Sequence, residues 1–237
     1  MPQPYLLHVH SQPTTIAPQV YHQWYLEEHI RDMVYFKVMK NSAIYQSTSD
    51  ALLSSNSNAQ KTDSMPFLAL YQTARSNCLE SAEFKNNVRV RSRLWDPDLK
   101  KHLSEVCEHS TQQLKLVEVL GSYEFNEDVA PHVVHMHYSG PDVEGKIQFE
   151  HVNAVSILDG YRRTLLYRPA EQPVEGMQEV FLVHEFETLD PSSLLYVRQA
   201  METIEPTNDC PFTLRSYTLL GCEGFGGQCR APERLER

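Results

Sequence analysis

The sequence contains one ordered set of segments twice, and this internal repeat restricts the fold more than any other feature. The matching pairs are LLHVHS at 6–11 with VVHMHY at 133–138, the gap-free segments 28–46 and 150–168, FLALYQT at 67–73 with VFLVHEFET at 180–188, and VEVLGSYEF at 117–125 with YTLLGCEGF at 217–225. One such match could arise by chance. Four matches in the same order indicate two copies of a single structural unit.

Each copy begins with a strand and a helix. The segments 6–11 and 133–138 alternate between two kinds of side chain, as strands do. The segments 67–73 and 180–188 are rich in β-branched, aromatic and aliphatic residues, which favour buried strands. A helix is predicted from Pro18 to Val38, because proline suits the first helical turn. Its counterpart covers Asp142 to Asp159 and stops at Gly160, since glycine commonly follows the last helical residue.

A second helix is predicted after the third strand of each copy. In the second copy, Asp190 and Pro191 form an N-cap and first-turn pair before SSLLYVRQAMETI. In the first copy, SNCLESAEFKNN at 76–87 and DPDLKKHLSEVCEHSTQQL at 96–114 occupy the same place. Each copy therefore has the order β-α-β-β-α-β, which is the ferredoxin-like arrangement.

We therefore predict an α+β protein built from two tandem ferredoxin-like halves, residues 1–127 and 128–237. A ferredoxin-like sheet carries helices on one face and leaves the other face bare. Packing the halves sheet to sheet buries both bare faces and encloses a cavity, which makes one barrel-like unit. A monomer would suffice for this barrel, and a homodimer stays open as an alternative.

Each half contributes a His-x-His pair to its first strand. Side chains alternate along a strand, so His8 and His10 share one face, and apolar neighbours share the other. His135 and His137 repeat the pattern. If the apolar face meets the helices, these four histidines point into the predicted cavity. The alternative is that they lie on an outward strand face.

The first predicted helix carries the segment YHQWYLEEH at 21–29. This segment resembles the signature of EthD-like proteins of the dimeric α+β barrel superfamily, which includes tetracenomycin-cyclase-like and fungal polyketide-pathway decarboxylase members. Ordinary members form the barrel from two chains, so this chain resembles a fused version. The second half has Lys146 and Ile147 where Trp24 and Tyr25 stand, which makes the first half the better candidate for a working site.

The resemblance implies that His29 lies near the barrel cavity, where an imidazole can accept and return a proton near neutral pH. Tyrosine hydroxyls can donate hydrogen bonds to a developing enolate. Tyr71 and His184 match in the repeat and should face the same way. The candidate catalytic residues are His29, His8, His10, Tyr71 and His184, and the candidate substrate-binding residues are Trp24, Tyr25, Tyr45, His135, His137, His151 and Tyr167. The alternative for each is a packed, hydrogen-bonded structural role.

The function that the resemblance implies is a cofactor-independent lyase or cyclase of secondary metabolism. Its substrate would be a hydrophobic, oxygenated small molecule such as a polyketide or terpenoid intermediate, and the reaction a decarboxylation, a cyclisation (pericyclic closure included) or an isomerisation. One alternative is a cofactor-free monooxygenase or a haem-using barrel protein, and another is a non-catalytic binding protein. No metal is expected from the resemblance, although His8, His10, His135 and His137 could together share an ion.

Composition argues against several other classes. The net charge of −10 disfavours binding to nucleic acid. No apolar run approaches the roughly 20 residues that span a bilayer, and the first residues lack a basic, then apolar, leader, so we expect no membrane association and a cytoplasmic location. The five cysteines form no Cys-x-x-Cys pair, and reduced thiols are the simplest expectation.

Overall fold

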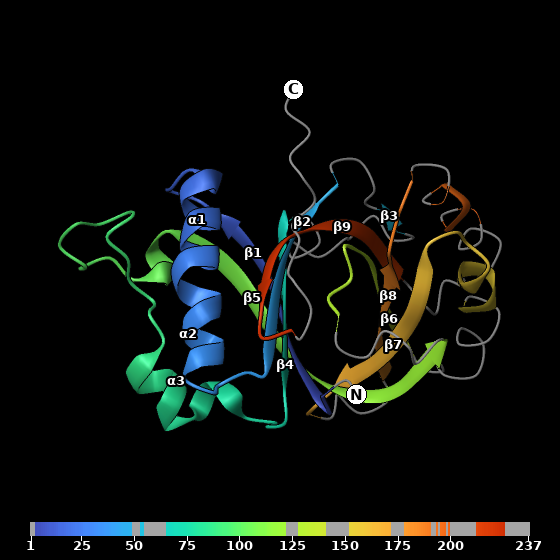
Figure 1. Ribbon diagram of the computed structural model, residues 1–237, viewed down its shortest axis with the longest axis horizontal. Coiled ribbons are helices and arrows are strands. Elements are labelled where there is room, and N and C mark those ends of the chain that lie inside the picture. Colours follow the sequence, from blue (N-terminus) through green and yellow to red (C-terminus); the bar gives the residue numbers. More distant parts are fainter. Residues whose placement is uncertain are drawn as a thin grey trace.

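Two four-stranded antiparallel sheets, one from each half of the chain, join edge to edge and close a barrel (Figure 1). The structure is a computed structural model, and it describes residues 3–48, 53–54, 65–121, 128–140, 152–171, 178–190, 193, 195–197, 199 and 212–225. Helices lie outside the barrel, against the outer faces of the two sheets. The α+β barrel predicted from the repeat is confirmed.

The elements follow the predicted order in both halves. The first half supplies β1 (Tyr5–Pro13), β2 (Asn41–Ser47), β4 (Phe67–Thr73) and β5 (Cys107–Gly121), with helices α1 (Pro18–Trp24), η1 (Tyr25–His29), α2 (Ile30–Tyr35), η3 (Cys78–Glu80), α3 (Ala82–Asn87) and η4 (Leu103–Glu105). The second half supplies β6 (His132–Gly140), β7 (Tyr161–Pro169), β8 (Gln178–Phe186) and β9 (Phe212–Glu223), and β3 (Leu53–Ser54) pairs with β9. Residues 152–156 and the described residues between 193 and 199 are helical.

The strand order is β2-β4-β1-β5-β7-β8-β6-β9, and β9 returns to pair with β2. Every pairing is antiparallel, and the two junctions that close the barrel are β5 with β7 and β2 with β9. Both junctions contain a register shift, at Ile44/Tyr45 and at Leu116/Glu118. Such irregularities bend and twist a strand, which helps a sheet to close on itself.

Side-chain alternation separates the barrel interior from the helix-covered faces. On β1, Leu7 and Val9 belong to the core formed with α1 and α2, whereas Leu6 belongs to the barrel interior. On β6, Val134 and Met136 pack in the corresponding core of the second half. The prediction that apolar residues of these strands meet helices is therefore confirmed, and the intervening histidines face inward.

One predicted helix end is confirmed by its geometry. The backbone N–H of Ser193 donates to Asp190 Oδ1 at 2.8 Å, so Asp190 caps the helix that follows it. The helix predicted over 142–159 lies within the described residues only from 152, and it ends at residue 156, earlier than predicted. Gly160 lies in the turn that follows, where its φ is +78° and a Cβ would meet backbone atoms of Thr188. The first predicted helix is also found, although its middle turn, η1, is π-helical.

The prediction of a helix over 96–114 is wrong. The Asp96 carboxylate accepts backbone N–H groups of Asp98, Lys100 and Lys101, which closes a turn in place of a first helical turn. Residues from Cys107 onward alternate between the two faces of β5. The expectation of reduced thiols is wrong for Cys222, which is disulfide-bonded, whereas Cys78 and Cys107 are free.

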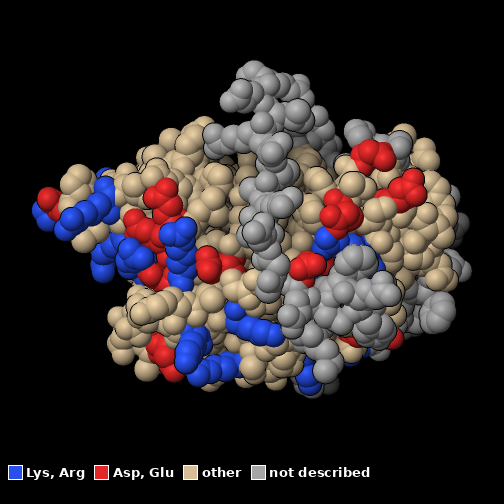
Figure 2. All heavy atoms as spheres, in the orientation of Figure 1, with Lys and Arg blue, Asp and Glu red and all other residues tan. Residues whose placement is uncertain are grey.

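On the face shown in Figure 2, Lys and Arg side chains are interspersed with Asp and Glu side chains and form no continuous basic area. Among the described residues, Arg89 pairs with Asp32 at 2.6 Å and Arg75 pairs with Glu83 at 3.2 Å. Among the residues that the structure describes, no helix is both long enough and apolar enough to cross a membrane.

Closure of the barrel predicts that neither half folds alone. Separation of residues 1–127 from 128–237 would expose the edges of β2, β5, β7 and β9 together with the apolar inner faces of both sheets. We expect each half expressed alone to be insoluble or to self-associate, and the co-expressed halves to form a one-to-one complex. Light scattering and thermal unfolding measure this. A half that is monomeric and unfolds cooperatively would contradict the prediction.

Candidate functional site

Histidines from opposite walls meet at the centre of the barrel. β1 and β6 are separated by three strands in either direction around the barrel, so they face each other across it. The His8 ring lies 4.6 Å from that of His10 and 4.6 Å from that of His135, and the His10 and His135 rings are 5.6 Å apart. We call His8, His10 and His135 the axial triad. His137 lies beside it, stacked on Phe181 at 4.3 Å.

Burial keeps the axial triad uncharged. It lowers the pKa of His8 and of His135 well below the ordinary value of 6.5. It lowers the pKa of His10 to about 3, with a further contribution from the positive charge of Arg215. The Nε2 atoms of His8, His135 and His137 are buried and have no hydrogen-bond partner among the described residues. The barrel interior therefore holds neutral imidazoles whose polar atoms are incompletely satisfied.

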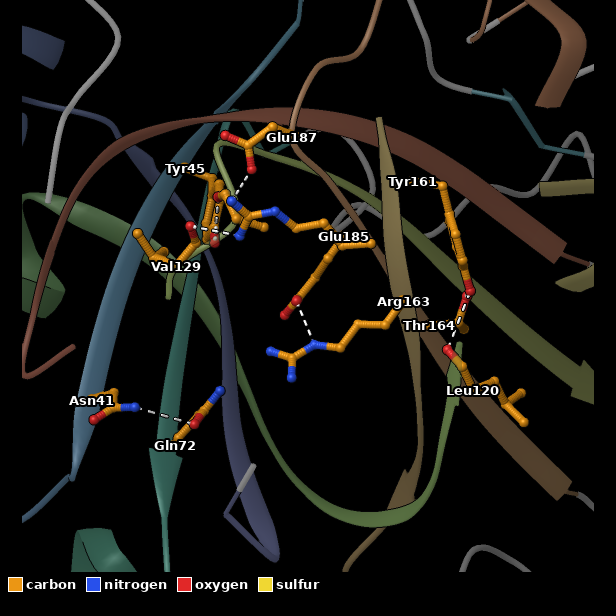
Figure 3. Close-up of polar contacts among 12 residues, drawn as sticks. Asn41, Tyr45, Gln72, Leu120, Val129, Tyr161, Arg163, Thr164, Glu185 and Glu187 are labelled. Carbon is orange, nitrogen blue, oxygen red and sulfur yellow. Dashed lines mark hydrogen bonds and ion pairs between the residues drawn. The ribbon is translucent and has the colours of Figure 1, made fainter. Parts of the chain in front are cut away.

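The other end of the barrel interior carries an ion pair. Arg163 Nε donates to Glu185 Oε2 at 2.6 Å, and both residues are buried (Figure 3). Tyr45 donates to the Ala130 carbonyl oxygen at 3.2 Å and lines a cavity together with Tyr167 and Glu185. The volume of this cavity is about 20 Å³, which is room for about one water molecule.

A second group of predicted residues lies on the other side of the first-half sheet, beneath α1 and α2. His29 stacks on Trp24 at 4.6 Å, and its ring meets the edges of Tyr25 at 5.1 Å and Tyr71 at 6.1 Å. The Tyr71 hydroxyl donates to that of Tyr25 at 2.6 Å. We call Trp24, Tyr25, His29 and Tyr71 the helix-side cluster, and all four side chains are buried.

The π-helical turn η1 builds this cluster. The N–H of Ile30 donates to the carbonyl oxygen of Tyr25, which is the wider spacing of a π-helix. Tyr25, His29 and the preceding Trp24 are all buried as a result, whereas Glu27 within the turn is exposed. Single π-helical turns occur often at functional sites.

His29 is held as a neutral base. Burial lowers its pKa to about 4, against the opposing effects of a hydrogen bond with the Arg89 backbone and of the Asp32 charge. Nδ1 is buried and has no hydrogen-bond partner among the described residues. In the tautomer that carries its proton on Nε2, the Nδ1 lone pair is free to accept a proton. Trp24 Nε1 in the stacked indole is likewise buried without a partner in the described part of the chain.

The structure does not bring all the predicted site residues together. His8, His10, His135, His137, Tyr45 and Tyr167 lie in the barrel interior, and His29, Trp24, Tyr25 and Tyr71 lie in the helix-side cluster. The expectation that His29 shares one cavity with His8 and His10 is wrong, because the first-half sheet stands between them. Side chains along β1 and β4 point alternately to the two faces of the sheet, and this alternation sets the arrangement.

His184 faces the same way as Tyr71, as the repeat predicted, and this is the helix-covered side. Its Nδ1 lies 2.7 Å from Thr164 Oγ1, in the core of the second half. His151 lies outside the described residues, as do Lys146 and Ile147.

Sequence reasoning missed the Arg163–Glu185 pair and the covering position of Trp95, whose ring meets the edge of Trp24 at 5.2 Å. Arg163 could have been found, since strand alternation places it on the same face as Tyr167. Trp95 gave no such signal because it lies in an irregular segment.

Comparisons with known proteins agree with this architecture. A protein from Fusobacterium nucleatum that was proposed to be a monooxygenase is 12% identical, with 97% of this chain and 99% of that chain covered and a TM-score of 0.53. DyPB from Rhodococcus jostii is 9% identical, with 92% and 93% covered and a TM-score of 0.50. An anthrone oxidase-like protein is 14% identical, with 97% of each chain covered and a TM-score of 0.44.

The chain has the dimeric α+β barrel fold. Both halves of the barrel come from one polypeptide. No protein-family profile and no curated protein sequence matches it. At these identities the likeness to solved structures establishes the fold, and the chemistry has to be argued from the residues themselves.

The low pKa of His29 predicts acid sensitivity. The folded protein keeps His29 neutral, whereas the unfolded chain binds a proton near pH 6.5, so stability falls as the pH drops from about 6.5 to about 4. His29→Gln should reduce the slope of the unfolding free energy against pH by up to about 1.4 kcal/mol per pH unit. Urea unfolding at several pH values measures it.

The exposed residue His109 supplies the control. His109→Gln should leave the slope unchanged. Equal slopes for the wild-type chain and His29→Gln would show that His29 is not held neutral.

Proposed function

We propose that this protein is a cofactor-free oxygenase in which His29 removes a proton from a hydrophobic, oxygenated small molecule. The observation that supports this proposal most directly is a pair of polar atoms in the helix-side cluster that have no hydrogen-bond partners among the described residues. The Nδ1 acceptor of His29 and the Nε1–H donor of Trp24 are buried in stacked rings 4.6 Å apart. Buried polar groups without partners cost about 1–3 kcal/mol each, so their retention suggests a ligand that satisfies both.

The chemistry follows from this donor and acceptor. A substrate with a methylene group activated by adjacent aromatic rings or a carbonyl loses a proton to His29 Nδ1 and becomes an enolate. The Trp24 N–H donates to the enolate oxygen. The enolate reduces dioxygen and forms a carbon–oxygen bond, giving a hydroperoxide. Loss of water, with the proton returned by His29, leaves a ketone, so CH₂ and O₂ become C=O and H₂O.

The aromatic walls suit such a substrate. Three aromatic rings, those of Trp24, Tyr25 and Tyr71, lie against His29. Tyr21 extends this aromatic wall, 5.2 Å from Tyr25 and 5.8 Å from Trp24. The Tyr71 hydroxyl is engaged by Tyr25 and burial raises the pKa of both phenols, which keeps them protonated as donors. The proposed monooxygenase activity of the Fusobacterium protein supports this assignment by analogy of fold.

The cluster is closed in this structure, so substrate access requires movement. Trp95, in the irregular segment between α3 and η4, covers Trp24. The segment is held to the helices by Arg89 Nη2 donating to Asp32 Oδ1 at 2.7 Å and by Ser92 Oγ donating to Glu28 Oε1 at 2.9 Å. Both hydrogen bonds are partly buried, and neither belongs to the sheet, so they can open without disturbing the strands.

Haem was an alternative expectation, and a DyPB variant has been solved in complex with heme. A haem needs a ring nitrogen facing a slot wide enough for the porphyrin. His29 Nδ1 is buried, Trp24 covers one face of the ring, and Tyr25 and Tyr71 stand at its edges. The helix-side cluster does not fit a haem, and no step of the proposed reaction uses one.

A lyase or cyclase reaction begins with the same proton removal, and dioxygen consumption distinguishes the two. The test incubates the purified chain with an anthrone and records oxygen uptake and product formation. We expect one O₂ consumed per ketone formed, and a loss of turnover of about 10²–10⁴-fold in His29→Gln, which keeps hydrogen bonding but cannot titrate. Trp24→Phe, which keeps an aromatic ring and removes the N–H, should lower turnover about 10²–10³-fold.

His109→Gln is the matched control and should retain wild-type turnover, since this histidine is exposed on β5. Product formation without oxygen uptake would favour the lyase or cyclase function. Binding without turnover would favour a carrier. Wild-type turnover per folded molecule in His29→Gln would remove His29 from the mechanism.

A further inference from the structure

We propose that the axial triad binds one first-row divalent metal ion of the zinc class and thereby connects the two halves of the barrel. His8 and His10 come from β1 in the first half, and His135 comes from β6 in the second. A ligand atom from each of the three residues lies within 4.8 Å of the others. This site is separate from the helix-side cluster and does not depend on the oxygenase proposal.

The geometry requires little rearrangement. In a tetrahedral zinc site with Zn–N bonds of about 2.0–2.1 Å, ligand nitrogens lie roughly 3.4 Å apart. The triad nitrogens, at up to 4.8 Å, would have to close by about 1.4 Å. Rotation of imidazole rings about their side-chain bonds covers such a change without moving the strands. The His8 and His135 rings are already close to parallel, with an interplanar angle of 27°.

Unsatisfied nitrogen atoms point to a ligand at this place. The Nε2 atoms of His8 and His135 are buried without hydrogen-bond partners among the described residues, although the two side chains are only 3% and 5% exposed. Burial of such atoms destabilises the fold. Leucine or phenylalanine could fill the barrel axis without that cost, as Phe181 does alongside. A metal ion would satisfy the lone pairs of both rings at once.

Outer contacts favour metal coordination by His10 as well. His10 Nδ1 lies 3.4 Å from the Tyr217 hydroxyl, an interaction that orients the ring and leaves Nε2 for a metal. Metal-bound histidines usually have such a partner on their second nitrogen. Arg215 contributes positive charge near His10. Its guanidinium donates to Ser47 Oγ at 2.8 Å and to the Met65 carbonyl oxygen at 2.6 Å.

The ligand set selects the class of ion. Three imidazoles without a carboxylate suit Zn²⁺, Cu²⁺, Ni²⁺ or Co²⁺, whereas Mg²⁺ and Ca²⁺ require oxygen ligands. A fourth position would be left for water or another donor. Because the ligands come from opposite walls, the ion would join two strands that share no hydrogen bond.

The test titrates the metal-free, untagged full chain with Zn²⁺ by calorimetry and with Co²⁺ by visible spectroscopy. We expect one ion per chain, a Kd of about 1 µM or below, a higher melting temperature with metal, and the intense visible absorption of four- or five-coordinate Co²⁺. His8→Gln and His135→Gln should each weaken binding at least about 100-fold. Circular dichroism checks that the variants are folded.

His184→Gln is the matched control. His184 is equally buried but lies on the helix-covered face beside Thr164, so its replacement should change Kd less than about threefold. Absence of Zn²⁺ binding, or binding unaffected by His8→Gln and His135→Gln, would overturn the proposal. If the variants do not fold, X-ray absorption of the Zn²⁺-loaded wild-type chain counts the imidazole ligands of the ion. Three imidazoles would support the proposed site, and fewer than three would exclude it.

Discussion

The two edge pairings between the halves are the interaction on which the rest of this structure depends. β2 with β9 and β5 with β7 convert two open sheets into one closed barrel, and they remove the four strand edges that separate halves would expose. Closure also gives every strand an inner and an outer face. The position of each candidate side chain, in the barrel or beneath the helices, follows from its parity along the strand.

This division creates two environments with different chemistry. Inside the barrel lie imidazoles from opposite walls and the buried Arg163–Glu185 pair. The cavity beside Tyr45 and Tyr167 has room for about one water molecule. Beneath α1 and η1, aromatic rings surround a histidine with a free lone pair, which suits a planar organic molecule once the Trp95 segment moves.

Histidines in these two environments therefore support different proposals. His29 has an acceptor atom beside an aromatic donor, which makes proton transfer the natural use. His8, His10 and His135 bring ring nitrogens within 4.8 Å of one another, which makes shared coordination the natural use. Burial lowers the pKa in both groups, because a charged imidazole is poorly solvated in a protein core.

Sequence alone determined the repeated β-α-β-β-α-β order, the strands at 6–11 and 133–138, the shared face of the two histidines on each of these strands, and the helix cap at Asp190. These depend on local periodicity and on backbone preferences of single residues. Tertiary structure decided that His29 and His8 lie on opposite sides of one sheet, that β1 and β6 stand opposite each other, and that Trp95 covers Trp24. Such relations depend on which strand edges pair and where an irregular segment packs, and the periodicity of a single strand or helix carries no information about either.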